Sequence, residues 1–238
     1  MFDTTIALAV AAFMAFLAMS GSNIEFYIIG IGIFIIWKLS IGKNFKVGFT
    51  SKNLWADLKD YGWSALLIVV FVILGFCLGL YPFDSKPDAY VLMYKILVDY
   101  VLIAVLEELF LRGLIQNIME KSLFGYKKKE AYIRAMLVTS LLYGLGKAST
   151  CLDKTPILVM AIFVWSVALS LYYGGIYAKT GNLIVPILCH ILINFGEIPF
   201  MFTTKTDYPM VSVCICMALY IVLGAHGVLV AGMKKNMD

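Results

Sequence analysis

Residues 104–113, AVLEELFLRG, place two adjacent glutamates, Glu107 and Glu108, and an arginine, Arg112, inside an otherwise apolar stretch. The apolar run around them, about 90–119, exceeds the roughly 20 residues that a helix needs to cross the hydrocarbon core of a bilayer. Charged side chains are costly at that depth, and they persist where they meet a partner inside the protein or serve a chemical function. The stretch therefore predicts a membrane helix whose charged groups face the protein interior.

The rest of the chain shares this apolar character. Of its 238 residues, 62% are hydrophobic and 14% are charged, whereas a soluble domain carries about 25% charged residues because water must solvate its surface. Apolar blocks separated by short polar segments predict an all-α, polytopic membrane helix bundle with about eight transmembrane helices in a single membrane domain, 1–238. The predicted spans are about 5–19, 24–37, 63–80, 90–119, 131–147, 156–177, 182–195 and 210–233.

The distribution of lysine and arginine predicts the orientation of the spans. The loops after the second and fourth spans are the most basic, and Lys179, Lys234 and Lys235 follow the sixth and eighth spans. Cytoplasmic loops carry an excess of lysine and arginine, so both termini are predicted to be cytoplasmic. Because topology accounts for the net charge of +4, we expect the lipid bilayer as a partner and no nucleic acid.

The charged residues of the fourth predicted span divide into a pair and a single group. Glu108 and Arg112 are four residues apart, so they share a helix face and can form an ion pair. Glu107 is rotated by about 100° from Glu108 and has no such local partner. A lone carboxylate in a dry pocket is a candidate general base. The structural alternative is an ion pair that stabilises the helix, with the other glutamate at the cytoplasmic interface.

A second polar cluster lies in the seventh predicted span. His190 and Asn194 are also four residues apart, which places them on one face of an apolar helix. A single histidine in such a helix is more often a hydrogen-bonded packing residue than a catalyst. The added Asn194 favours a polar site between helices.

Three elements of the chain, taken in order, resemble the CAAX-processing and bacteriocin-processing (CPBP, or Abi) family of intramembrane proteases, which includes the type II prenyl-protein endopeptidases. They are Glu107-Glu108-x-x-x-Arg112, an aromatic-x-x-x-polar segment, and His190-x-x-x-Asn194. The segment 180–186, TGNLIVP, also resembles the family's approach to its last motif. The resemblance covers a core of about 90–200.

The resemblance implies a glutamate-based intramembrane endopeptidase without a cofactor. Glu107 would activate a water molecule, and Glu108 with Arg112 would orient and support it. His190 and Asn194 would stabilise the tetrahedral intermediate, at which preorganised donors are most effective. The expected partner is a membrane-associated peptide or protein substrate, and the short loops favour a relative in a bacterial plasma membrane. We expect the fourth, fifth and seventh spans to enclose a polar cavity reached from the cytoplasmic side or from within the bilayer.

The middle motif departs from the family's pattern. The family has Phe-x-x-x-His, whereas this chain has Tyr143-Gly144-Leu145-Gly146-Lys147. An imidazole can share the water and relay a proton, but a charged ammonium only donates hydrogen bonds. Lys147 has three alternatives: an ion pair with Glu107 that weakens the base, a neutral amine that accepts a proton, or a side chain that reaches the outer interface.

Other functions are consistent with the same residues. A catalytically impaired relative would act by binding, in bacteriocin self-immunity or in the regulation of signalling, and Lys147 favours this alternative. A proton-coupled transporter would use Glu107 and Glu108, although the sequence has no apparent inverted repeat. Zinc ligation by Glu107, Glu108 and His190 is a further alternative, but no His-Glu-x-x-His motif is present. The sequence therefore predicts no metal.

Overall fold

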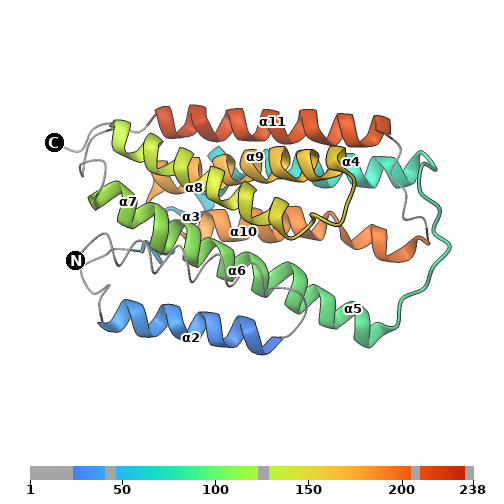
Figure 1. The fold of residues 1–238 in the computed structure, drawn as a ribbon, viewed down its shortest axis with the longest axis horizontal. Coiled ribbons are helices and arrows are strands. Elements are labelled where there is room, and N and C mark those ends of the chain that lie inside the picture. Colours follow the sequence, from blue (N-terminus) through green and yellow to red (C-terminus); the bar gives the residue numbers. More distant parts are fainter. Residues whose placement is uncertain (1–23, 41–46, 123–128, 205–209, 234–238) are drawn as a thin grey trace.

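The computed structural model describes residues 24–40, 47–122, 129–204 and 210–233. Every regular element in these ranges is a helix, which confirms the all-α prediction (Figure 1). In chain order the elements are α2 (Ile24–Ser40), α3 (Leu54–Asp57), η2 (Leu58–Gly62), α4 (Ala65–Cys77), α5 (Ala89–Lys95), η3 (Ile96–Leu102), α6 (Ile103–Glu108), η4 (Leu109–Gln116), α7 (Asn117–Ser122), α8 (Lys129–Ser149), α9 (Pro156–Thr180), α10 (Ile184–Phe195), η5 (Ile198–Phe202) and α11 (Met210–Gly232).

Helices that could cross a membrane make up much of the described chain. Four are long and apolar enough: Ala89–Glu120, Pro156–Thr180, Ile184–Phe202 and Val211–Gly232. A fifth is added if Leu54–Gly62 and Ala65–Cys77, which meet at an angle of 57°, form one bent span. Length and composition therefore support an integral membrane protein.

The predicted count of about eight spans is only partly tested. The predicted spans 24–37 and 131–147 are helical, as α2 and α8, but α2 is too short and α8 is not apolar enough to join the four helices above. The predicted span 5–19 and both termini lie outside the described residues. The count of eight and the cytoplasmic termini thus stay predictions.

The predicted span 90–119 is one long helix with two π-helical stretches. It runs without interruption through α5, η3, α6, η4 and α7, and η3 and η4 are the π-helical parts. The junction between α6 and η4 falls directly after Glu108. Wider π-helical turns inside α-helices occur frequently at functional sites. The two glutamates therefore lie where the helix geometry changes.

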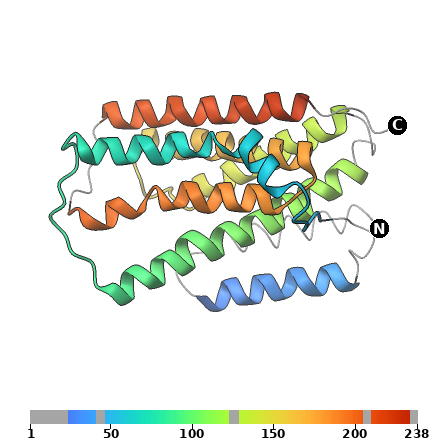
Figure 2. The same ribbon diagram turned by 180° about the vertical axis from the view of Figure 1, so that it is seen from behind.

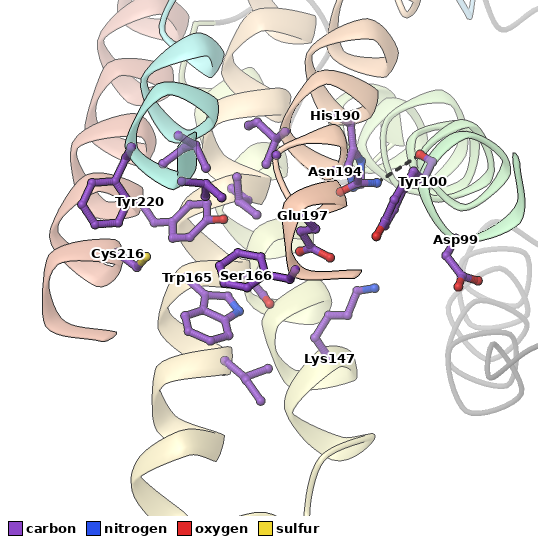
Figure 3. A pocket seen from close by; sticks show the side chains of 18 of the residues that line it. Asp99, Tyr100, Lys147, Trp165, Ser166, His190, Asn194, Glu197, Cys216 and Tyr220 are labelled. Carbon is purple, nitrogen blue, oxygen red and sulfur yellow. Dashed lines mark hydrogen bonds between the residues drawn. The ribbon is translucent and has the colours of Figure 1, made fainter. Parts of the chain in front are cut away.

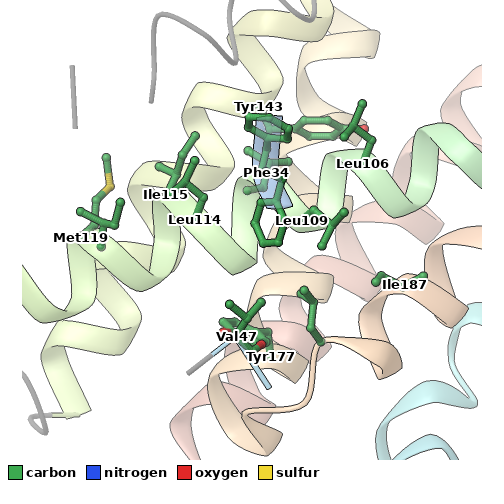
Figure 4. Packing of buried hydrophobic residues seen from close by; sticks show 14 of the residues in the cluster. Phe34, Val47, Leu106, Leu109, Leu114, Ile115, Met119, Tyr143, Tyr177 and Ile187 are labelled. Carbon is green, nitrogen blue, oxygen red and sulfur yellow. Dashed lines mark hydrogen bonds between the residues drawn. The ribbon is translucent and has the colours of Figure 1, made fainter. Parts of the chain in front are cut away.

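The helices are arranged around α9. It packs along α8 and α11, while α10 packs against α4, α9 and α6 (Figures 1 and 2). The apolar core next to the long helix includes Phe34 of α2, whose ring centroid lies 6.2 Å from that of Phe110 (Figure 4). Leu109, Tyr177 and Ile187 belong to the same cluster. Such packing holds membrane helices together, because lipid tails are as apolar as the side chains.

A hydrogen-bonded turn sets the direction of α10. Gly181 ends α9 in a left-handed conformation with φ of 63°, and its N–H donates to the carbonyl oxygen of Tyr177 at 2.8 Å. The side-chain oxygen of Asn182 accepts from the N–H of Ile184 at 3.1 Å. The Asn182 amide also donates to the carbonyl oxygen of Thr50 at 2.9 Å. These bonds fix the point at which α10 enters the bundle.

We predict that Gly227→Ala destabilises the bundle by about 1–3 kcal/mol, because a methyl group overpacks a filled interface. A Cβ at this position would overlap the backbone of Leu171 and Tyr172 in α9. Gly232, at the end of the same helix, has open space around it. Gly232→Ala should therefore change stability by less than about 0.5 kcal/mol. Unfolding of the purified protein in detergent measures both, and equal stabilities would contradict the close approach of α9 and α11.

Candidate active site

Three helices bring the predicted site residues together. The long helix supplies Glu107 in α6, α8 supplies Lys147, and α10 supplies His190 and Asn194. The Glu107 side chain is 1% exposed and that of Lys147 is 26% exposed, so the site lies inside the protein with one side open. Glu108 and Arg112 are completely buried beside it.

Glu107 has a donor on each oxygen and a histidine nearby. Its Oε1 lies 2.6 Å from Nζ of Lys147, and its Oε2 accepts a hydrogen bond of 2.7 Å from the hydroxyl of Tyr143. Nε2 of His190 lies 3.7 Å from the same Oε2. Tyr143 and Lys147 are one helical turn apart, so α8 presents both to the glutamate. Of the three alternatives for Lys147, the structure has the ion pair with Glu107.

Glu108 forms the predicted pair with Arg112 and extends it. Nε of Arg112 lies 3.2 Å from Oε2 of Glu108. Nη2 of Arg112 also donates to the backbone oxygen of Ser170 at 2.6 Å and to its hydroxyl oxygen at 2.9 Å. This arrangement ties the long helix to the middle of α9. Because the guanidinium is planar and rigid, it also fixes the direction of the Glu108 carboxylate.

His190 bridges the two glutamates. Its Nδ1 lies 3.0 Å from Oε1 of Glu108, and its Nε2 faces Glu107. A carboxylate that is paired with Arg112 only accepts hydrogen bonds, so Nδ1 carries the proton and donates. The ring of Tyr173 stacks on the imidazole, with centroids 4.7 Å apart and planes 16° apart. The orientation of His190 is thus held from two sides, with Nε2 directed to Glu107.

Asn194 is turned toward the long helix. Its Nδ2 donates to the backbone oxygen of Tyr100 at 3.1 Å (Figure 3). An amide nitrogen has two hydrogens, so one donor is left. Asn194 and His190 line the same cavity, as their spacing predicted.

A cavity of about 710 Å³ lies next to these residues (Figure 3). Its exposed lining residues lie at one end of the bundle: Leu80 after α4, Lys95 at the end of α5, Thr150 after α8 and Glu197 after α10. We call this the mouth end. A cavity with an apolar wall and a few convergent polar groups is typical of a small-molecule or peptide site.

The mouth end and the basic end of the bundle lie opposite each other. In the described part of the chain, the opposite end carries Lys38, Lys52, Lys59, Arg134 and Lys179 (Figure 1). If this basic end is cytoplasmic, as the charge distribution predicts, then the mouth end faces away from the cytoplasm. A ligand would then reach the cavity from within the bilayer or from the side of the membrane opposite the cytoplasm.

The two glutamates do not converge on one point with His190, because they meet opposite nitrogens of its ring. Among the described residues, no group of three or more His, Cys, Asp or Glu side chains is placed to hold a metal ion. In this structure His190 therefore lies between the two other residues considered as zinc ligands, hydrogen-bonded to Glu108 and 3.7 Å from Glu107.

Several residues of the site were not predicted from the sequence. Ser170 and Tyr173 hold Arg112 and His190, and they belong to a stripe of polar residues in an apolar helix. The stripe consists of Ser166, Ser170, Tyr173 and Tyr177, which are all buried. Spacings of four, three and four residues mark one helix face, so this pattern could have been found in the sequence. The hydroxyl of Tyr143 had no comparable signal.

Comparison with known families gives one match. Residues 89–196 match the family model described as type II CAAX prenyl endopeptidase Rce1-like. No curated protein matches the chain, and no solved structure does. The matched segment runs from the start of α5 to the turn after α10, so it contains all six predicted site residues.

We predict that Arg112→Leu destabilises the protein by about 3–5 kcal/mol, because it leaves the buried Glu108 carboxylate without its counter-ion. Arg134 is exposed on α8, and Arg134→Leu should cost less than about 0.5 kcal/mol. Chemical unfolding in detergent compares the two. Arg112→Lys keeps the charge but loses the planar fork, and we expect it to lie between them. Equal stability of the two leucine variants would contradict a buried ion pair that holds the bundle.

Proposed function

We propose that this protein is an intramembrane endopeptidase that cleaves a membrane-associated peptide or protein, because residues 89–196 match the family model of Rce1-like type II CAAX prenyl endopeptidases. The observation that carries the proposal is the buried Glu107 carboxylate at the cavity, with the histidine of the last motif 3.7 Å away. A carboxylate beside a histidine, shielded from bulk water, is an arrangement suited to activating a single water molecule.

The glutamate has room for that water. Each carboxylate oxygen has two lone pairs, and in the described structure Tyr143 occupies one of those on Oε2. We propose that a water donates to the second lone pair of Oε2, between Glu107 and Nε2 of His190. Glu107 takes the proton of the water as its oxygen attacks the carbonyl carbon of the scissile bond. The same proton passes to the departing amine when the carbon–nitrogen bond breaks.

Three donors surround the position where the carbonyl oxygen becomes negative. We assign this role to the free amide hydrogen of Asn194, to Nε2 of His190 when it is protonated, and to the ammonium of Lys147. The bond from Nδ1 of His190 to Glu108 supports the protonated ring, since Glu108 carries negative charge. Each preorganised donor of this kind commonly raises the catalytic rate by a factor of roughly 10² to 10³. Lys147 thereby supplies a fixed positive charge where the family has a histidine.

We predict that Glu107→Gln lowers the cleavage rate by roughly 10²- to 10⁴-fold, which is the usual contribution of a general base. Tyr143→Phe removes one neutral hydrogen bond to the carboxylate and should cost about tenfold. Lys147→His restores the family's residue and should retain activity within about tenfold of the original protein. Cleavage of the natural membrane substrate, followed by mass spectrometry in liposomes, measures all three.

Glu130→Gln is the matched control for the glutamate substitution. Glu130 is exposed in the first turn of α8, at the end of the bundle opposite the cavity. It should leave cleavage unchanged. Full cleavage activity of Glu107→Gln would overturn the proposed role of Glu107 as the general base. Absence of cleavage in the original protein as well would leave binding without cleavage as the function.

We also propose that the mouth end faces away from the cytoplasm. In the described structure this end carries Lys86, Lys95 and Lys154, and it carries the carboxylates Asp84, Asp88, Asp99, Asp153 and Glu197. The positive-inside rule counts lysine and arginine near the ends of spans, and these gather at the opposite end. A substrate would then reach the cavity from the extracytoplasmic side or from the outer half of the bilayer.

A labelling experiment tests this orientation. Cys151 lines the cavity at the mouth end, and Lys52 is exposed at the basic end. We predict that a variant with Cys151 as its single cysteine reacts with a membrane-impermeant maleimide in intact cells. A cysteine-free variant with Lys52→Cys should react only after the membrane is opened. The reverse pattern would place the cavity on the cytoplasmic side.

A further inference from the structure

The cavity contains one carboxylate that the proposed cleavage does not use. Glu197 lies in the turn after α10, seven residues after His190. Its N–H donates to the backbone oxygen of Asn194 at 2.9 Å, and its own backbone oxygen accepts from the N–H of Phe200 at 3.0 Å. Figure 3 shows its side chain in the cavity, between Asn194 and Lys147. The backbone of Glu197 is thus held directly after the helix that carries the last motif.

The Glu197 carboxylate has no counter-ion of its own. Within the described ranges it forms no ion pair and no side-chain hydrogen bond, and its side chain is exposed to the cavity. Lys147 acts on it through space but is bound to Glu107 at 2.6 Å. Lys95, the other lysine of the cavity, interacts with Asp99 one turn along the long helix. The lysine that acts on Glu197 is therefore already ion-paired with Glu107.

The lining of the cavity suits a cation. It contains two lysines and three carboxylates, which leaves one negative charge unbalanced while His190 is neutral. Tyr220 of α11 lies within electrostatic range of Glu197, and its ring centroid is 6.2 Å from that of Trp165. Aromatic faces attract cations, and a carboxylate attracts them more strongly in an apolar cavity than in water.

We propose that Glu197 binds the cationic side chain of a lysine or arginine in the substrate. Glu197 follows Asn194, which borders the reacting groups, so the basic residue would lie close to the scissile bond. The protein would then select membrane-associated peptides that carry a basic residue beside the cleavage site. This inference rests on the proposed function, and it names the substrate class of the same site.

The test uses a series of peptides with one apolar host sequence. Each peptide carries a single Lys, Gln or Glu, and this residue is placed at successive positions of the peptide. The full-length protein in liposomes is given each peptide, and two quantities are recorded. Cleavage is followed by mass spectrometry, and occupancy of the cavity is followed by protection of Cys151 from maleimide. Glu197→Gln, Glu197→Lys and the control Glu130→Gln are compared with the unsubstituted protein.

We expect the best Lys peptide to protect Cys151 at a roughly 10- to 100-fold lower concentration than its Gln counterpart. A hydrogen bond to a charged group commonly changes affinity by about this factor. Glu197→Gln should abolish this difference, Glu197→Lys should shift the preference to the Glu peptide, and Glu130→Gln should change nothing.

Two results overturn the inference. In the first, the Lys and Gln peptides protect Cys151 equally well, or neither protects it. In the second, the preference for the Lys peptide persists in Glu197→Gln. Protection that depends on Glu197 without any cleavage would contradict the proposed function and leave the cation site in place. Cleavage without a preference for Lys would contradict the cation site alone.

Discussion

Two carboxylates on consecutive residues of a buried helix cannot share one counter-ion, because about 100° separates their directions. Glu108 meets Arg112 on its own helix, whereas Glu107 meets Lys147 from α8. His190 contacts both glutamates through opposite nitrogens. The positions of the long helix, α8 and α10 therefore depend on one another. Since breaking a buried ion pair commonly costs about 3–5 kcal/mol, this set of contacts constrains the whole bundle.

The exchange of histidine for lysine in the middle motif has a structural consequence. A neutral imidazole at this position could accept a proton, whereas an ammonium can only donate hydrogen bonds. In this chain Lys147 binds Oε1 of Glu107, so the proposed proton transfer would use Oε2 of Glu107, which faces Nε2 of His190. The added positive charge also changes the balance of the cavity, where Glu197 is the carboxylate without its own cation.

The spacing of residues predicted the contacts and shared faces that lie within a single helix. The Glu108–Arg112 pair and the shared face of His190 and Asn194 follow from a separation of four residues, and the structure has both. The distance between Glu107 and Lys147 could not be predicted, because it depends on the register of two helices that are 40 residues apart in sequence. The family motif indicated the position of Lys147, and the ion pair with Glu107 was one of three alternatives that the sequence left open.

The end of the bundle at which the cavity opens could not be predicted from the sequence for a similar reason. Charge distribution predicted which loops are cytoplasmic, but the depth of Glu107 and the side on which the helices splay depend on packing. The π-helical stretch after Glu108 is a further example, since the apolar run reads as an ordinary helix. By contrast, the all-α class follows from composition alone, because a bilayer permits only helices and closed barrels.

We propose that the pair of Glu107 and Lys147 is a reaction site and not only a structural contact. The double substitution Glu107→Lys with Lys147→Glu separates these roles, because it keeps both charges and exchanges their places. Cleavage and unfolding of the double variant should be measured beside the two single variants. Our account predicts that stability recovers toward that of the original protein while cleavage stays lost, since the base has moved away from His190. Recovery of cleavage together with stability would contradict it.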